Sequence, residues 1–233
     1  MKIIGIVRSG FTQKFGIPRQ AGLGPDLKAT LVIQKEFADP DWWRGIESFS
    51  HLWFITHLHQ SDDSKTSPVV RPPRLGGNAK LGVFATRSPV RPNPLGLSLV
   101  ENKGLEFTDK ETLLHFANHD LLNGTPIFDI KPYIKEVDAR MEATDGWIQD
   151  SAHQEYSVEL TAEVLMSLSQ FIPDQLEREV FLRAIAQILR FDIRPRYKKT
   201  NELSWFSYQG IDLGFTQETE SLFKISQIKA SLL

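Results

Sequence analysis

Residues 68–100 bring together five cations and six of the chain's 13 prolines without a single carboxylate. The cations are Arg71, Arg74, Lys80, Arg87 and Arg91, so the segment has a net charge of +5. Each proline fixes φ and removes a main-chain donor, which favours rigid irregular turns. Guanidinium groups on rigid turns lose little entropy when they bind an anion, so we interpret the segment as a phosphate- or carboxylate-binding surface. A solvated basic loop with structural prolines is the alternative.

A second group of polar residues follows a turn in the middle of the chain. Asn123-Gly124 is typical of a tight turn, and Asp129, Lys131 and Tyr133 then alternate along one face of an expected strand. These three side chains either form a solvated sheet edge or line a pocket, and the residues alone leave both interpretations open.

A third group lies near the C-terminal side. Residues 190–199 contain five basic residues, one acid and two aromatics, with a net charge of +4. Cations between aromatic rings suit a nucleic-acid strand, in which phosphates pair and bases stack. The alternatives are a helix C-terminus complemented by cations, or packing of this segment on the rest of the fold.

Other spacings carry less weight. His57 and His59, and likewise His115 and His119, have metal-like spacings, but no carboxylate completes either set, so we interpret them as structural histidines. Glycine-rich phosphate loops and the serine elbow of hydrolases are missing from the sequence. Because the chain has no cysteine, thiolate zinc sites, cysteine nucleophiles and cysteine-held iron–sulfur clusters are excluded.

The elements that must position these residues are mostly strands in the first 134 residues. Short apolar runs bounded by Gly, Pro, Asn or Asp predict strands at residues 2–8, 29–33, 51–57, 81–86, 97–106, 112–118 and 127–134. The gaps between them are mostly too short for a helix after every strand, which favours an antiparallel sheet or barrel. Residues 40–49 are expected to contain one or two helical turns.

The second half of the chain has a different pattern. Residues 138–154 are polar and are expected to be a linker or exposed loop, and helices are expected at 161–171 and 173–189, the second with an apolar stripe of Leu176, Val180, Ala184 and Ile188. Three short segments follow, at 203–208, 211–216 and 222–228. We therefore expect a mainly β domain at 1–137 and a small α+β domain at 155–233.

The composition is that of an ordinary globular protein. Of 233 residues 41% are hydrophobic, and 27 Lys+Arg against 29 Asp+Glu give a net charge of −2, which excludes a generally basic nucleic-acid coat but not a local patch. No apolar run is long enough for a signal peptide or a membrane span. We expect a cytoplasmic protein without a membrane partner.

Several motifs, in one order, resemble the TsaA-like (TrmO) family. They are Phe-Gly-Ile-Pro-Arg-Gln at 15–20, Phe-Ser-His-Leu-Trp at 49–53, Arg-Pro-Pro-Arg-Leu-Gly-Gly-Asn at 71–78, Gly-Val-Phe-Ala-Thr-Arg-Ser-Pro at 82–89, Arg-Pro-Asn-Pro at 91–94, and Asp-Leu-Leu-Asn-Gly-Thr-Pro at 120–126 with Asp-Ile-Lys-Pro-Tyr at 129–133. This resemblance spans residues 3–134. The Asp-x-Arg-Pro-x-Tyr segment at 192–197 resembles the C-terminal extension of longer bacterial members.

The resemblance implies a single-sheeted antiparallel β-barrel that binds S-adenosylmethionine without a Rossmann fold. It also implies a homodimer with the cofactor site close to the subunit interface. The implied reaction is methylation of N6 of threonylcarbamoyladenosine (t6A) at position 37 of tRNA, in the anticodon loop, giving m6t6A.

By motif, the resemblance also implies which residues contact the cofactor. They come from a turn, two strand ends and two loops, namely Pro18, Arg19, Gln20, His57, Leu58, Arg87, Leu97, Asp120, Leu121, Leu122 and Asn123. A guanidinium such as that of Arg87 can pair with the carboxylate of S-adenosylmethionine, and Asp120 can accept from its amine or ribose.

On the substrate side, Asp129 and Tyr133 are our candidates to accept the N6 proton or position the base, with Lys131 or Arg91 on the threonyl carboxylate or a phosphate. The remaining candidate tRNA contacts are Arg71, Arg74, Arg194 and Arg196. A barrel that binds S-adenosylmethionine or tRNA without turnover, or that methylates another small substrate, is the alternative function.

Overall fold

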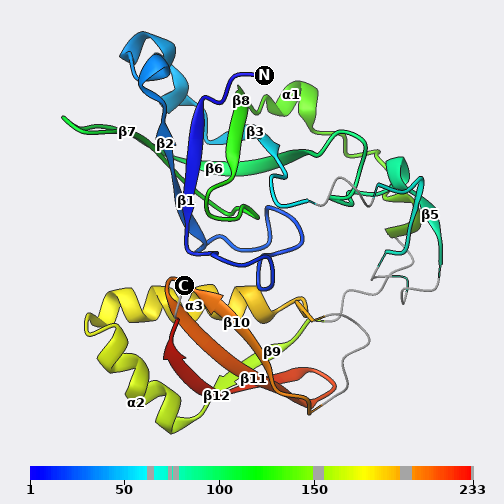
Figure 1. The fold of residues 1–233 in the computed structure, drawn as a ribbon, viewed down its shortest axis with the longest axis vertical. Coiled ribbons are helices and arrows are strands. Elements are labelled where there is room, and N and C mark those ends of the chain that lie inside the picture. The colour runs from blue at the N-terminus through cyan, green and yellow to red at the C-terminus, as the bar shows by residue number, and fades with distance from the viewer. Residues whose placement is uncertain (62–65, 73–74, 76–78, 149–154, 195–200, 232–233) are drawn as a thin grey trace.

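A computed structural model describes residues 1–61, 66–72, 75, 79–148, 155–194 and 201–231 of the chain. Figure 1 shows two bodies stacked along the long axis, the upper built from the N-terminal strands and the lower from the C-terminal strands and two helices. In the described chain no helix is long and apolar enough to cross a membrane.

The upper body is a closed antiparallel barrel. Its six strands are β1 (Gly5–Ser9), β2 (Lys28–Ile33), β3 (His51–His57), β6 (Leu95–Phe107), β7 (Thr112–Ala117) and β8 (Pro126–Pro132), in the order β1-β2-β7-β6-β3-β8. Pairing of β1 with β8 closes the ring. The predicted single-sheeted antiparallel barrel is therefore confirmed.

Alternation of side chains along the strands fills the barrel interior. In β3 the odd positions lie outside at intermediate exposure, whereas Leu52, Phe54 and Thr56 are fully buried. Phe54 meets Phe116 of β7 edge to face, with ring centroids 5.0 Å apart. The outward-facing side chains of the same strands are therefore available to bind a ligand or substrate.

One predicted element differs from the structure, and the helical turns predicted at 40–49 are confirmed. Of the strand expected at 81–86, only β5 (Leu81–Gly82) forms, paired with β4 (Val69–Val70). The chain then enters a 3₁₀ turn at Val83–Ala85, because Val83 is buried and its N–H donates to the carbonyl of Pro68 at 3.0 Å. Residues 40–49 form two 3₁₀ turns, the first capped by the carboxylate of Asp39.

The lower body pairs a four-stranded sheet with two helices. The strands β9 (Ser157–Leu160), β10 (Ser204–Tyr208), β11 (Ile211–Thr219) and β12 (Leu222–Ala230) lie in the order β10-β11-β12-β9, with α2 (Ala162–Phe171) and α3 (Gln175–Leu189) packed beside them. Thr161 and Asp174 cap the two helices. The predicted stripe of α3 is only partly right: Leu176 is 69% exposed, and the buried face includes Phe181, Ala184, Ile185 and Ile188.

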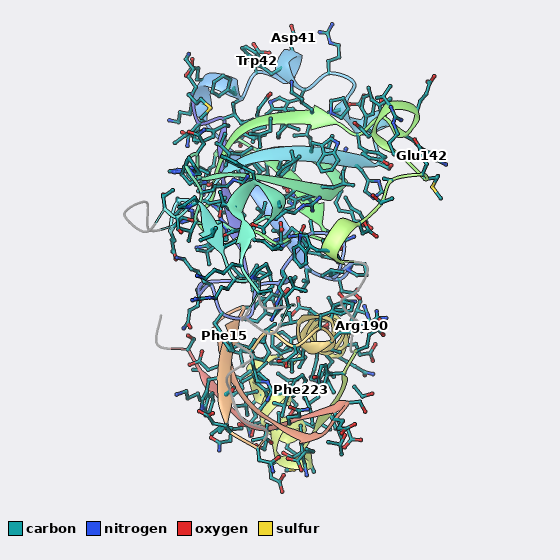
Figure 2. The ribbon with its side chains drawn as sticks, turned by 90° about the vertical axis from the view of Figure 1, so that its right-hand side faces the viewer. Phe15, Asp41, Trp42, Glu142, Arg190 and Phe223 are labelled. Atoms are coloured by element: carbon teal, nitrogen blue, oxygen red, sulfur yellow. The ribbon has the colours of Figure 1, made fainter. Side chains whose placement is uncertain are left out.

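The two bodies share a hydrophobic core. Phe11 and Leu27 from the long β1–β2 loop and Leu122 after β7 lie in the same buried cluster as the helices and sheet of the lower body. Phe15 packs at this junction (Figure 2). The side chain of Gln187 on α3 donates to Asp26 at 2.7 Å. The loop that carries the cofactor motif at 15–20 is therefore held between the barrel and the C-terminal body.

Between the bodies runs the polar segment predicted as a linker. The predicted linker, residues 138–154, starts at the last residue of α1 (Lys135–Asp138) and contains a 3₁₀ turn at Gly146–Ile148, while residues 149–154 lie outside the described chain.

Candidate S-adenosylmethionine site

The carboxylate of Asp120 is the centre of the candidate site. Asp120 lies just after β7, where Asn118 turns the chain with a φ of 61°. Oδ1 of Asp120 accepts a 2.6 Å hydrogen bond from the Ser98 hydroxyl on β6. Burial raises the pKa of Asp120, while the Ser98 hydroxyl, main-chain donation and the charge of Arg87 act in the opposite direction. A half-buried acceptor therefore lies within electrostatic reach of a cation from a distant segment.

Arg87 comes from the basic proline-rich segment and meets the β1–β2 loop. Its guanidinium donates to the side-chain oxygen of Gln20, and the main chain of Ala21 hydrogen-bonds to Asp120. Segments about 33 to 100 positions apart in the sequence are thereby brought to one end of the barrel. Of the cofactor residues predicted from the motifs, Gln20, Arg87 and Asp120 are assembled into one cluster.

The start of β6, next to this cluster, is packed tightly against β3. A Cβ on Gly96 would lie 2.3 Å from Oγ1 of Thr56 and 3.2 Å from Leu58, so only glycine fits there. The Thr56 hydroxyl is fully buried and has no hydrogen-bond partner among the described residues. Leu97, the next residue on β6, is 60% exposed, and Leu58 is partly exposed. The start of β6 thus places the exposed apolar side chain of Leu97 next to the polar pair of Ser98 and Asp120.

These residues fit the chemistry of S-adenosylmethionine. Arg87 offers a guanidinium to a carboxylate, Asp120 offers an acceptor to an amine or ribose hydroxyl, and the surface around Leu97 offers contact area to an adenine. The glycine at position 96 lets Thr56 of β3 pack directly against the main chain of β6, which fixes the strand end that carries Leu97. The donor and acceptor set therefore matches the charges of the cofactor.

The other predicted cofactor residues take different roles. Leu121 packs in the barrel core and Leu122 in the C-terminal core, so they can offer only main-chain groups to a ligand. The side chain of Asn123 accepts from the Ser9 N–H at 3.2 Å. His57 stacks on Phe128 with ring centroids 5.7 Å apart, close to the same barrel end.

Pro18 and Arg19 belong to the junction between the two bodies. Pro18 is buried, and the guanidinium of Arg19 donates to the carbonyl oxygens of Asp192 and Arg194 at 3.0 and 3.4 Å. Arg19 thus ties the motif loop to the segment after α3 in this structure.

The strand with alternating polar residues lies two strands away from Leu97. Asp129 of β8 is in register with Ile55 of β3, which is in register with Leu97 of β6. Strands about 4.8 Å apart place Asp129 about 10 Å from Leu97 on the outer face. Asp129 pairs with Lys131 at 3.2 Å, and the Tyr133 ring packs against Trp53 with centroids 6.0 Å apart. The side chains of Asp129 and Lys131 are both about half exposed, so either of them can exchange its partner for a substrate group.

The structure corrects one candidate for tRNA contact. Arg194 is 5% exposed, pairs with Asp192 at 2.9 Å, donates to Gln217 at 2.6 Å and covers the ring of Phe223. It packs inside the C-terminal body because the sheet supplies an acceptor and an aromatic face for it. Arg71 is exposed and Arg91 donates to the carbonyl oxygens of its own turn, whereas Arg74 and Arg196 lie outside the described residues.

Sequence reasoning missed Ser98, Thr56 and Gly96. All three lie at inward or crowded positions of strands, and polar residues at positions where alternation predicts apolar ones are the signal that was available. In the described part of the chain, no group of three or more histidine or acidic side chains is placed to hold a metal ion.

A family model, curated relatives and solved structures all point to the same family. Residues 6–139 match the model of the tRNA-methyltransferase O N-terminal domain. An Escherichia coli tRNA (adenine(37)-N6)-methyltransferase is 41% identical over 202 residues, covering 85% of this chain and 83% of that protein. A Pyrococcus abyssi relative, named as a probable S-adenosyl-L-methionine-binding protein, is 38% identical over 65% of this chain and 77% of its own length. The crystal structure of a TrmO from Pseudomonas aeruginosa superposes with a TM-score of 0.79 at 31% identity, covering 98% of this chain and 96% of that one.

Proposed function

This chain belongs to the tRNA-methyltransferase O family, an S-adenosylmethionine-dependent family of tRNA (adenine37-N6)-methyltransferases, and we propose that its substrate is t6A at position 37 and its product m6t6A. The observation that carries the proposal is the convergence of Gln20, Arg87 and Asp120 at the barrel end, within two strands of Asp129 and Lys131.

The cofactor supplies a methyl carbon activated by a sulfonium, so the chain has only to align the acceptor nitrogen and receive one proton. The N6 of t6A lies between a purine and a carbonyl, which makes its proton more acidic than that of adenosine. A weak oxygen acceptor then suffices, and Asp129 and Tyr133 are the candidates to take the proton. We favour Asp129 over Tyr133, because Asp129 is paired with Ile55 of β3 and Ile55 is paired with Leu97 of β6.

Lys131 supports the t6A substrate specifically. The threonyl group carries a carboxylate that plain adenosine lacks, and a half-exposed ammonium can exchange Asp129 for it. Release of Asp129 from that pair would also leave its carboxylate available as an acceptor.

We propose that the enzyme is a homodimer. Leu97 and Leu95 of β6 are 60% and 38% exposed on the outer face next to the candidate site, an apolar surface that a second copy would cover. Such a partner would also close the site from solvent. We place the enzyme in the cytoplasm, where a tRNA-modifying enzyme meets its substrate.

The alternative, a barrel that binds S-adenosylmethionine or tRNA without turnover, is separated by two measurements. Isothermal titration with S-adenosylmethionine tests binding, and transfer of tritiated methyl from S-adenosylmethionine to bulk tRNA tests turnover. We expect label in tRNA that carries t6A and none in tRNA from cells that lack the threonylcarbamoyl group. Binding without any label would favour the alternative.

A further inference from the structure

We propose that Phe84 stacks on a nucleobase of the anticodon loop at or beside position 37. The proposal rests on the proposed function and names a substrate contact for it. Phe84 is 79% exposed, and no other aromatic side chain in the described part of the chain is as open to solvent. A side chain of this size gains nothing from folding unless something covers it.

The turn that carries Phe84 is rigid. Val83, before it, is buried, and the Thr86 side chain and main chain donate to the Val83 carbonyl at 2.9 and 3.1 Å. The indole of Trp147, from the segment between the two bodies, donates to the Ala85 carbonyl at 2.9 Å. A ring held out from a fixed turn loses little entropy on binding, which is the property of a stacking platform.

Charge and position select a nucleic acid as the partner. Phe84 is three residues from Arg87, and no acid occurs in the sequence between residues 68 and 100, so this segment attracts an anionic chain. In Figure 1, β5, which leads directly into this turn, stands at one side of the barrel away from β1. An enzyme that acts on a base must also unstack it from its neighbours, and an aromatic side chain compensates for that loss.

The first test measures binding to a t6A-containing anticodon stem-loop RNA. The loss of one stacked base predicts that Phe84→Ala raises Kd about 5- to 100-fold, while the Tm and the affinity for S-adenosylmethionine stay unchanged. Phe84→Trp should bind within about threefold of the wild type, because the ring is kept. Phe107→Ala is the matched control, since Phe107 is 49% exposed at the far end of β6 and should have no effect.

The second test couples the ring to one base. The Kd values of wild type and Phe84→Ala are measured with stem-loops that carry an abasic nucleotide at position 36, 37 or 38. When the missing base is the one that stacks on Phe84, Phe84→Ala should raise Kd less than about twofold. An equal loss with all three abasic loops, or no loss with the intact loop, would overturn the inference. So would conversion of a dimer to a monomer by Phe84→Ala in light scattering, since the ring would then belong to an interface between copies.

These readouts separate the inference from the proposed function. If the wild type transfers no methyl to t6A-containing tRNA, the proposed function falls, while the binding cycle still decides whether Phe84 stacks on a base. Full methyl transfer together with an unchanged Kd in Phe84→Ala sinks the inference alone.

Discussion

At the scale of the residue, our proposal assigns Arg87 to the carboxylate of S-adenosylmethionine and Asp120 to its amine or ribose. Arg87→Ala should weaken S-adenosylmethionine binding about 30- to 150-fold, because it removes a charge-assisted pair with the ligand carboxylate. Arg71→Ala, an exposed arginine of the same basic segment, should change the affinity less than about threefold. Isothermal titration of both variants decides the matter, and equal affinities would refute the assignment of Arg87.

His119 makes the barrel end sensitive to acid. Burial lowers the pKa of His119 to about 4, and its Nδ1 accepts from the Leu121 N–H at 3.1 Å. Between this pKa and the unfolded value of 6.5 the unfolded chain binds more protons, so the free energy of unfolding decreases as the pH falls through that window. The decrease should approach about 3 kcal/mol at pH 4.

A non-titrating variant isolates this effect. His119→Gln should flatten the pH dependence of the free energy of unfolding between pH 6.5 and 4, measured by urea denaturation. An unchanged pH slope in His119→Gln would show that another group is responsible.

Residue identity was the most predictable part of the site. Arg87 and Asp120 follow from motif position and chemistry, and the structure brings them together with Gln20. Arg19 and Arg194 show the limit of that reasoning, because a guanidinium that ties parts of the fold together looks the same in sequence as one that binds a ligand. Only the three-dimensional neighbours, here carbonyl oxygens, Asp192 and Phe223, distinguish the two uses.

At the scale of the element, the segment after α3 packs on the C-terminal sheet. Arg194→Ala should lower the free energy of unfolding by about 2–4 kcal/mol, because it leaves Asp192 and Gln217 without their buried donor. Arg190→Ala is the control: its exposed pair with Glu155 should contribute less than about 1 kcal/mol. If Arg194→Ala kept its stability and lost only tRNA affinity, the packing account would be wrong.

Elements with regular alternation could be predicted, and irregular ones could not. The barrel strands at 51–57 and 112–117 lie where periodicity placed them, because one face of each is buried. The run at 81–86 is apolar enough for a strand, yet burial of Val83 and the bond to Pro68 turn it into the platform for Phe84. The strand β9 was missed because its parallel partner β12 lies more than 60 residues later.

At the scale of the whole molecule, the two bodies share one core through Phe11, Leu27 and Leu122, while the division of the chain near 137 and 155 stays a prediction. The exposed leucines of β6 lead us to expect a dimer, which light scattering at micromolar concentration measures directly. Leu95→Asp should shift the dimer toward monomer and lower methyl transfer together, since it places a charge in the covered face and leaves Leu97 in place. A fully active monomer of the wild type would contradict the dimer.

The most direct test of the account is the identity of the methylated nucleoside. Purified enzyme is incubated with S-adenosylmethionine and t6A-containing tRNA, and the digested nucleosides are analysed by mass spectrometry. We expect a t6A peak heavier by one methyl group, with the added mass on the purine N6 side and absent from the ribose. In Arg87→Ala this heavier peak should be lost. A methyl group on any other nucleoside, or equal methylation of tRNA that lacks the threonylcarbamoyl group, would contradict the account.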